Sequence, residues 1–453
     1  MNMESRGEAP GSHIAQTYAA RTPKSAALAR RAGHRIPGGV NRGIVHFQPH
    51  PIFFDRGEGD CLIDIDGNRY VDCIGNYTTM VIGHNHPHVV AAIERQLPKG
   101  TAWSGGTADE IELADLIAAR MPSIEAVKFT ASGTEATMLA VRAARAFTGR
   151  PLAAKFEGGY HGLHDVAMVS LAPTPDRYGP ADRPANVPAD GIPEGVARSV
   201  LVLPFNDAAA VRKLLRERAR DVACILVEPV QGVAGIVAPE DGFLAALRET
   251  ADEIGCLLIF DEVISFRLAF GGAQEVQGVR ADLTTLGKII GGGFPIGAIG
   301  GRRDVMEVFA PGGPGPKVTL SGTFHANPVA LAAGIATLAV FDRPAIDALN
   351  RRGARLADRL RQAFSELAPT LTLNAVGSLF NVHCTGGPVR CYRDSQRGDR
   401  TAVQLLYLAL LNEGVLLTPR GMGALSTVMT DSHEDQLIAA FRTALPMVFR
   451  RNP

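Results

Sequence analysis

The chain has 453 residues, of which 46% are hydrophobic and 20% are charged, and its 46 Lys and Arg residues balance its 46 Asp and Glu residues. This length predicts two or more compact domains, and the composition is ordinary for a soluble globular protein. The balanced charge gives no electrostatic reason to expect a nucleic acid or an anionic membrane as a partner.

The six cysteines are spread along the chain without a CxxC pair, a pattern that suits a reducing compartment and not a disulfide framework. The N-terminal segment lacks the apolar run of a signal peptide. The longest apolar stretch, residues 329–341, is shorter than the ~20 residues of a membrane span and predicts a buried helix. We therefore expect a cytoplasmic protein.

The N-terminal part predicts one helix followed by three short strands. An Asp66-Gly67 turn between the second and third strands is a hairpin signal. The helix is expected over residues 25–35, and the strands over residues 52–55, 61–64 and 70–73.

From about residue 86 the pattern changes to helices that alternate with apolar strands. Continuous apolar runs are typical of parallel strands buried on both faces, and the alternation predicts an α/β domain with a mostly parallel sheet. Helices are expected over residues 88–97, 109–120 and 134–147, and strands over residues 126–130, 222–227 and 256–260.

Two further regions follow. Residues 172–195 are rich in Pro, Asp and Ala without periodicity and predict a long loop. After about residue 345 the pattern predicts a smaller α+β domain. Its helices are expected over residues 354–367, over residues 401–412 and from Asp431, with strands within residues 371–383.

The first of four motifs that indicate one cofactor is Phe129–Ala136, in which a strand is followed by a tight Ser132-Gly133-Thr134 turn and a helix start. Backbone N–H groups at such a start, helped by the hydroxyl groups, form an anion site. The alternative is an ordinary helix cap, which is the commoner meaning of this motif taken alone.

The second motif is an apolar strand that ends in Asp261, with Val263 two residues on. Ligands of open α/β sheets lie at the carboxyl ends of the strands. An aspartate there could pair with a protonated pyridine nitrogen, and Val263 could pack on the ring face. The alternative is an acid that caps the next helix.

The third motif is Lys288, which follows Gly287 and precedes an apolar, glycine-rich stretch. Burial lowers the pKa of an amine and makes it a nucleophile that can form a Schiff base. The alternatives are a surface lysine and a phosphate loop, but a P-loop places its lysine after the glycines.

The fourth motif places Tyr160 in the glycine-rich loop Gly158-Gly-Tyr-His-Gly162, where an aromatic ring can stack on a planar cofactor. A plain loop with one buried tyrosine is the alternative.

Taken together and in this order, these motifs resemble the class III aminotransferases of fold type I. The resemblance extends from about Pro37 to the C-terminal helix and is strongest in the segments SGTEA, YHG, EPVQG, FDEV, LTTLGKIIGGG and SGTFHANP. It implies an α/β fold in which a large domain with a mostly parallel sheet spans residues 86–344. A smaller α+β domain would be built from both chain ends, residues 1–85 and 345–453.

The resemblance also implies pyridoxal 5'-phosphate as the cofactor. Lys288 would form the Schiff base, Asp261 would hold the pyridine nitrogen, and Gly133 and Thr134 would bind the phosphate. The full set of implied cofactor residues is Ser132, Gly133, Thr134, Tyr160, Gln231, Asp261, Val263, Lys288 and Thr323.

Two of these residues have particular implied positions. Gln231 would lie near the 3'-oxygen of the ring. Thr323 would reach the phosphate of the neighbouring subunit, so the resemblance implies a homodimer with shared active sites.

Within the class, the chain resembles both β-amino-acid transaminases, such as those acting on β-phenylalanine, and glutamate-1-semialdehyde aminomutase. The segment Leu283–Lys288 is shared with the aminomutase. Three features favour the transaminases: Arg42, where they hold the substrate carboxylate, Gln231, where the aminomutase has Ala, and Arg420, which would serve the keto-acid partner. An arginine fork suits a carboxylate, although a solvated surface cation is the common alternative.

The segment His84-Asn-His-Pro-His88 suggests a metal site, but its spacing is that of neither an EF-hand nor an HExxH site, and a structural turn is favoured. We therefore expect no metal.

The sequence thus predicts an enzyme that moves the amino group of a β-amino acid to an α-keto acid. A mutase or racemase on the same cofactor is the alternative. A non-catalytic relative is disfavoured by the intact Lys288 and Asp261.

Overall fold

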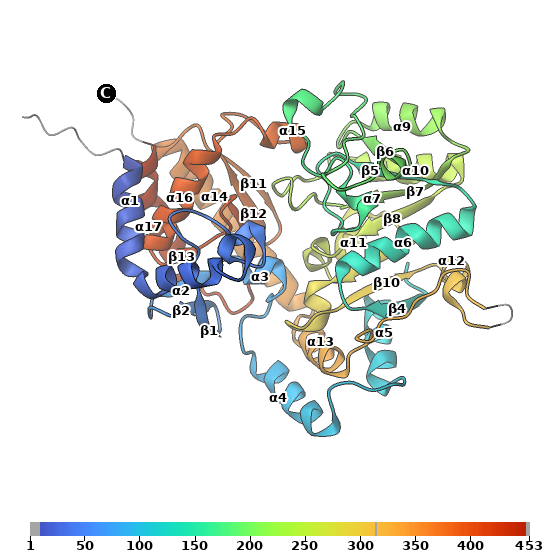
Figure 1. The fold of residues 1–453 in the computed structure, drawn as a ribbon, viewed down its shortest axis with the longest axis horizontal. Coiled ribbons are helices and arrows are strands. Elements are labelled where there is room, and N and C mark those ends of the chain that lie inside the picture. Colours follow the sequence, from blue (N-terminus) through green and yellow to red (C-terminus); the bar gives the residue numbers. More distant parts are fainter. Residues whose placement is uncertain (1–9, 313–314, 450–453) are drawn as a thin grey trace, which may run out of the picture.

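A computed structural model describes residues 10–312 and 315–449 of the chain. It has two parts: the middle of the chain forms one, and both ends of the chain come together in the other (Figure 1). The sequence prediction of a large α/β part and a smaller part built from both ends is confirmed, while the domain boundaries at residues 85 and 344 stay a prediction.

A seven-stranded sheet forms the centre of the large part. The five strands β9, β8, β7, β5 and β6 are parallel, whereas β10 runs antiparallel to both of its neighbours, β9 and β4. In sheet order the strands are β4 (Ala126–Thr130), β10 (Gly297–Gly301), β9 (Leu283–Gly287), β8 (Leu257–Asp261), β7 (Val222–Val227), β5 (Leu152–Phe156) and β6 (Val200–Leu203).

Helices cover both faces of this sheet, which is why β7 is apolar at every position. Ile225 and Val227 belong to a buried cluster with helices α9 (Ala208–Glu217) and α10 (Phe243–Ile254). The alternate residues, Cys224 and Leu226, belong to a second cluster with helix α6 (Gly133–Thr148). The other helices of the large part are α4 (Pro87–Gln96), α5 (Ala108–Arg120), α7 (Asp165–Met168), α8 (Glu194–Ala197), α11 (Gly272–Gln277), α12 (Arg303–Met306) and α13 (Pro328–Val340).

The smaller part contains two sheets. In the first, strand β13 near the C-terminus pairs in parallel with the N-terminal strand β3, and the hairpin predicted around Asp66-Gly67 joins β2 to β3. The sheets comprise β1 (Phe54–Glu58), β2 (Cys61–Asp64), β3 (Arg69–Asp72) and β13 (Val415–Leu416), and β11 (Thr372–Val376), β12 (Leu379–His383) and β14 (Met422–Ala424).

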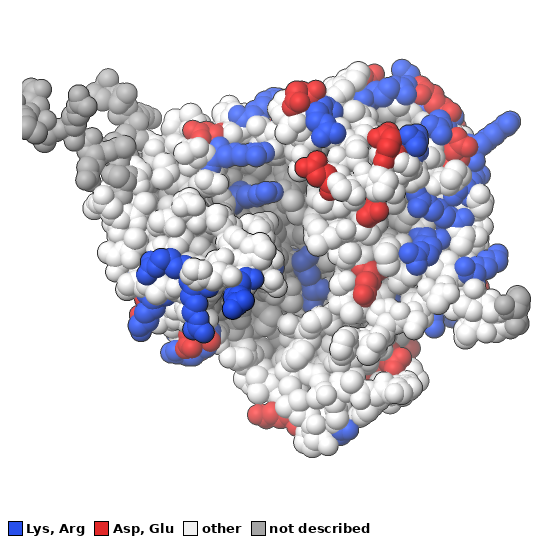
Figure 2. Space-filling model, in the orientation of Figure 1, with Lys and Arg blue, Asp and Glu red and all other residues white. Residues whose placement is uncertain are grey.

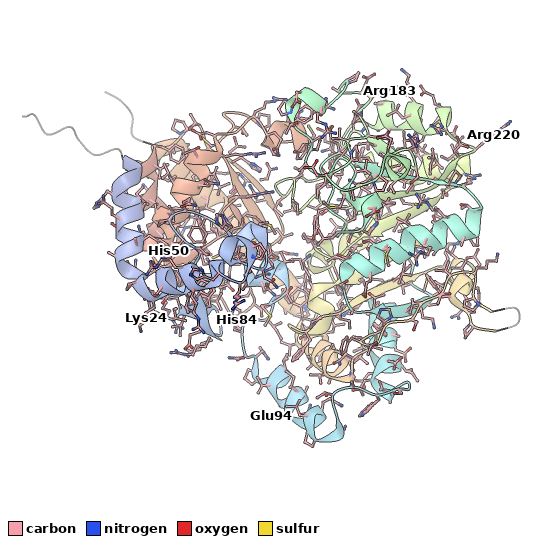
Figure 3. The ribbon with its side chains drawn as sticks, in the orientation of Figure 1. Lys24, His50, His84, Glu94, Arg183 and Arg220 are labelled. Carbon is pink, nitrogen blue, oxygen red and sulfur yellow. The ribbon has the colours of Figure 1, made fainter. Side chains whose placement is uncertain are left out.

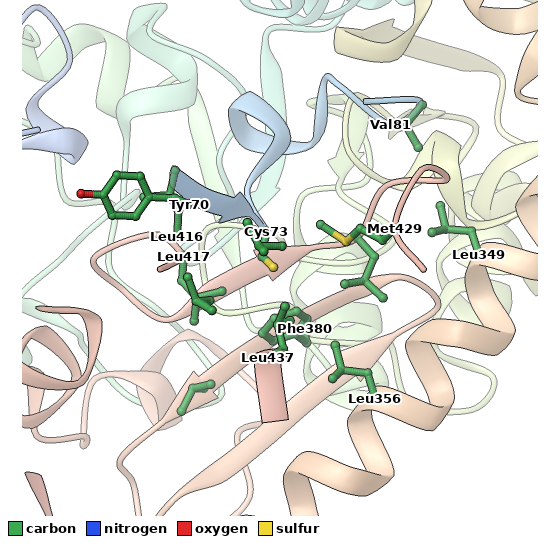
Figure 4. Close-up of a cluster of buried hydrophobic side chains, with 14 of the residues drawn as sticks. Tyr70, Cys73, Val81, Leu349, Leu356, Phe380, Leu416, Leu417, Met429 and Leu437 are labelled. Carbon is green, nitrogen blue, oxygen red and sulfur yellow. The ribbon is translucent and has the colours of Figure 1, made fainter. Parts of the chain in front are cut away.

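Side chains from both ends of the chain share one core in this smaller part. The helices around it are α1 (Pro10–Arg21), α2 (Pro23–Gly33), α3 (Gly75–Thr78), α14 (Arg343–Leu367), α16 (Arg400–Asn412) and α17 (Asp431–Val448). Helix α15 (Tyr392–Ser395) packs on the large part instead, where Tyr392 belongs to the buried cluster that includes α9 and α10. Figure 4 shows the N-terminal Tyr70, Cys73 and Val81 in the same cluster as the C-terminal Leu349, Leu356, Phe380 and Leu437. Neither end has a complete apolar core without the other.

Several element predictions were wrong in extent. The prediction placed one helix at residues 25–35, but α2 ends at Gly33 and is preceded by α1. Helix α14 begins at Arg343, eleven residues before the predicted start, because Pro344 is tolerated in a first turn. Strands β5, β6, β9 and β10 were not predicted, whereas residues 172–195 form the expected loop apart from a short turn and the start of α8.

Among the described residues, no single helix is both long and apolar enough to cross a membrane. Helices α13 and α14 reach that length and composition only as a pair, and they are bent by 72° at their junction.

Candidate active site

A cavity of about 560 Å³ lies at the carboxyl ends of strands β7, β8 and β9 and brings most of the predicted residues together. Figure 2 shows a hollow between the two halves of one face, with Lys and Arg side chains along it. The predicted residues that line the cavity are Arg42, Ser132, Gly133, Thr134, Tyr160, Asp261, Val263 and Lys288.

Lys288 follows directly after β9 and begins a short 3-10 turn. Its φ is 51°, a left-handed conformation that is uncommon for a residue with a Cβ and that concentrates at functional sites. Burial lowers the pKa of the Lys288 amine below its ordinary value, against the attraction of Asp261 and Glu228. The turn therefore presents an amine that loses its proton more readily than a solvated lysine does.

Asp261 is the last residue of β8 and is buried. Its Oδ2 atom lies 2.8 Å from His161 Nδ1, and its Oδ1 atom accepts a hydrogen bond from the Val263 backbone N–H at 3.2 Å. Burial lowers the pKa of His161. A neutral His161 that donates from Nδ1 would stabilise the ionised carboxylate of Asp261.

The N-terminus of α6 points into the same cavity. Ser132 caps the helix through a hydrogen bond from the Glu135 N–H to its hydroxyl group, at 3.2 Å, so the ordinary cap is present. Within the described chain, the N–H groups of Gly133 and Thr134 have no hydrogen-bond partner. Two free N–H groups at the positive end of a 16-residue helix form an anion site.

Two glycines, Gly133 and Gly162, allow the N-terminus of α6 to lie close to the loops that contain Gly162 and Val263. A Cβ atom on Gly162, whose φ is +90°, would lie 2.7 Å from Thr134 Cβ, and one on Gly133 would lie 3.1 Å from Val263 Cγ2. Tyr160, two residues before Gly162, is thereby held in the wall of the cavity.

Glu228, in the segment EPVQG, also lines the cavity, although no role was predicted for it. It is buried at the end of β7 and accepts hydrogen bonds from the N–H groups of Tyr160, at 2.8 Å, and Gly232, at 3.0 Å. Burial, followed by the nearby Asp261, raises the pKa of Glu228 to about 8. Glu228 comes directly after an apolar strand, and this sequence signal, which identified Asp261, could also have identified Glu228.

Arg42 enters the cavity from the smaller part. Its Nη1 donates to Asn76 Oδ1 at 2.8 Å, and its guanidinium carbon lies 5.4 Å from the ring centre of Tyr77. Asn76 also lines the cavity and was missed by the sequence analysis.

Three predicted residues do not line this cavity. Gln231 is buried, and its Nε2 donates to the Glu157 carbonyl oxygen at 3.2 Å. Thr323 and Arg420 are exposed. Arg420 nevertheless lies close enough to Tyr77 to oppose, together with Arg42, the rise in the pKa of that tyrosine that burial causes. The roles of all three stay predictions.

The histidine-rich segment forms a turn in which His84 Nε2 lies 2.7 Å from Asp72 Oδ2. Figure 3 shows His84 among the N-terminal segments. No cluster of three or more His, Cys, Asp or Glu side chains able to hold a metal ion occurs in residues 10–312 and 315–449.

The donor set of the cavity fits a phosphorylated pyridine. The α6 N–H groups match a phosphate, buried Asp261 matches a protonated ring nitrogen, and the amine of Lys288 can bond to an aldehyde carbon.

Comparison with known proteins agrees with this geometry. A family model described as "Aminotransferase class-III" matches residues 44–448. A glutamate-1-semialdehyde 2,1-aminomutase from Methanothermobacter thermautotrophicus is 44% identical over 398 residues, which cover 87% of this chain and 92% of that protein. An omega-transaminase from Sphaerobacter thermophilus has a TM-score of 0.90 and 40% identity, covering 94% of this chain and 97% of that chain. A β-phenylalanine aminotransferase from Variovorax paradoxus has a TM-score of 0.86 and 38% identity, covering 96% of this chain and 97% of that chain.

Proposed function

Because the chain belongs to the class-III aminotransferase family, we propose that it transfers the amino group of a β-amino acid to an α-keto acid. The family makes the chain a pyridoxal-phosphate-dependent enzyme with fold type I. The observation that carries the finer proposal is the position of Arg42, a carboxylate-binding side chain in the wall of the cavity that also contains Lys288 and Asp261.

The residues of the cavity divide the chemistry among them. When bound, pyridoxal phosphate supplies an electron sink for the bond that breaks at the amine-bearing carbon. Asp261, which contacts His161 at 2.8 Å, would keep the ring nitrogen protonated. The Lys288 amine, whose pKa burial lowers, would be the general base that accepts a proton from that carbon.

Tyr160 and Val263 have a different role, which is to orient the cofactor ring. Both line the cavity, and the Tyr160 backbone is fixed by its hydrogen bond to Glu228. An aromatic ring on one face and a branched aliphatic group on the other would hold a planar ring in place.

A 2,1-aminomutase acting on glutamate-1-semialdehyde is the second candidate, and the 44% identity to the Methanothermobacter protein favours it. The two functions differ in where the amino group goes, which is to a separate keto acid in a transaminase and back to the same substrate molecule in an aminomutase. A transaminase needs a keto acid to regenerate its cofactor, whereas an aminomutase returns the amino group to the same substrate.

The test is a half-reaction on the purified holoenzyme, in which the visible absorbance of the cofactor is followed after addition of one donor. β-Phenylalanine should discharge the cofactor, and pyruvate should restore it. Sustained turnover of glutamate-1-semialdehyde without a keto acid, with no response to β-amino acids, would replace the proposal with the aminomutase.

Arg42→Ala should raise the KM of the β-amino acid about 10- to 100-fold, since charged hydrogen bonds contribute ~1.5–3 kcal/mol, and leave the cofactor spectrum unchanged. Arg31→Ala in α2 is a matched control, because Arg31 is exposed and lies outside the cavity. An unchanged KM in Arg42→Ala would remove this residue from the site.

We propose further that the enzyme is a cytoplasmic homodimer. Exposed Thr323, outside the cavity of its own chain, is available to a neighbouring subunit. The six free cysteines support this localisation, because a reducing compartment keeps thiols unpaired.

A further inference from the structure

The backbone of helix α3 is unusual, because the four residues Gly75, Asn76, Tyr77 and Thr78 have φ values of 53°, 48°, 55° and 77°. Residues with a Cβ rarely adopt the left-handed conformation, and successive ones are rarer still. Such a run persists only where surrounding contacts impose it, and it concentrates at functional sites.

Those contacts come from the end of strand β3. Asp72 Oδ1 accepts hydrogen bonds from the N–H groups of Ile74, at 2.9 Å, and Gly75, at 3.0 Å. The other carboxylate oxygen of Asp72 pairs with His84 at 2.7 Å. The His84 turn thus anchors the left-handed turn.

The left-handed turn aims two side chains at Arg42. Asn76 Oδ1 accepts from the guanidinium at 2.8 Å, and the Tyr77 ring lies 5.4 Å from its central carbon. Asn76 and Arg42 both line the cavity. The amide Nδ2 of Asn76 donates no hydrogen bond to any described residue, so its two N–H donors remain available beside the guanidinium.

We infer that Asn76 is a specificity-determining residue, which fixes the Arg42 guanidinium and donates its own amide N–H to the same substrate carboxylate. This inference rests on the proposed binding of the donor carboxylate at Arg42. The left-handed backbone of residues 75–78 would then serve to place the amide group of Asn76. We expect donors with a carboxylate to be preferred over otherwise identical amines.

The test measures binding of hydrocinnamate, which is β-phenylalanine without its amino group, to the holoenzyme by titration calorimetry. Asn76→Gly keeps the left-handed turn, since glycine adopts positive φ freely, and removes the whole side chain, including the amide that contacts Arg42. The Kd of this variant for hydrocinnamate should rise about tenfold. Asn76→Asp puts a carboxylate against Arg42, so its Kd should rise about 100-fold or more through pairing with Arg42 and repulsion of the ligand.

The matched control is Asn206→Gly, because Asn206 is also an asparagine with positive φ, 64°, and lies outside both the cavity and the His84 turn. Its Kd should equal that of the wild type. Wild-type affinity in both Asn76 variants, or no hydrocinnamate binding by the wild type, would overturn the inference. If the Asn76 variants weaken binding while β-amino acids fail to discharge the cofactor, the inference stands and only the proposed function fails.

Discussion

His161 Nδ1 lies 2.8 Å from Asp261 Oδ2, and both side chains are buried although 100 residues separate them in the chain. His161 Nε2 is also buried and has no partner among the described residues. The His161 imidazole is therefore held through Nδ1, by the Asp261 carboxylate, which lines the cavity. This geometry makes His161 a positioning residue for Asp261.

His161→Ala should lower kcat by about 10- to 100-fold, because the buried Asp261 carboxylate loses a hydrogen bond whose loss costs ~1.5–3 kcal/mol. His161→Asn, which retains an N–H donor of similar reach, should recover part of this loss. Steady-state kinetics and the visible spectrum of the bound cofactor measure both variants. Wild-type kcat and spectrum in His161→Ala would contradict the role.

Gly162→Ala should weaken cofactor binding by at least tenfold, because its Cβ would lie 2.7 Å from Thr134 Cβ and displace the N-terminus of α6. Equilibrium dialysis against pyridoxal phosphate measures the effect. Gly191→Ala is the matched control, since Gly191 has a similar φ of +87° but nothing within 4 Å of an added Cβ. Equal losses in the two variants would mean that backbone strain, and not the contact with Thr134, is the cause.

Because Lys155 is buried, we expect the free energy of unfolding to depend on pH. Lys155 is fully buried and its Nζ donates to the Val169 carbonyl oxygen at 2.7 Å. Burial lowers the pKa of Lys155 from 10.5 to about 7, so between these pH values the folded state binds fewer protons than the unfolded state. The free energy of unfolding should therefore rise with pH across this window, by roughly 1.4 kcal/mol for each pH unit.

Lys155→Met removes this proton linkage while keeping an unbranched side chain. Urea unfolding of both proteins at about pH 7 and about pH 9 measures it. The wild type should gain stability relative to the variant at the higher pH, and a difference that stays constant with pH would refute the assignment.

The ion pair between Arg393 and Glu157 joins α15 to the large part of the molecule. Arg393 Nε and Nη2 donate to the two carboxylate oxygens at 2.6 and 2.9 Å, and Glu157 is buried. Arg393→Met should lower the free energy of unfolding by ~3–5 kcal/mol, because it leaves an unpaired buried charge. The double variant Arg393→Met/Glu157→Gln should be more stable than Arg393→Met alone, and simple additivity of the two single losses would argue against a coupled pair.

The sequence predicted best those features that depend on neighbouring residues. The apolar strand before Asp261, the glycines around Lys288 and the capped start of α6 were all readable, and the structure places these groups in one cavity. Local patterns suffice there because parallel strands bring their carboxyl ends to one edge of the sheet.

Strand β10 was not predicted because its residues, GAIGG, have little β-propensity of their own. β10 is a strand because it lies between β4 and β9. Its glycines are needed there, since a Cβ atom on Gly301 would lie 2.9 Å from the Cα atom of Leu283.

The sequence by itself determined the chemical groups at the site: an amine, an acid and a helix start, each fixed by residues adjacent in the chain. Only the tertiary structure decided their partners, because His161 reaches Asp261, and Asn76 reaches Arg42, through contacts between distant segments. It also decided that Arg420 lies outside the cavity. Side-chain distances across a fold depend on how whole elements pack, which no local pattern encodes.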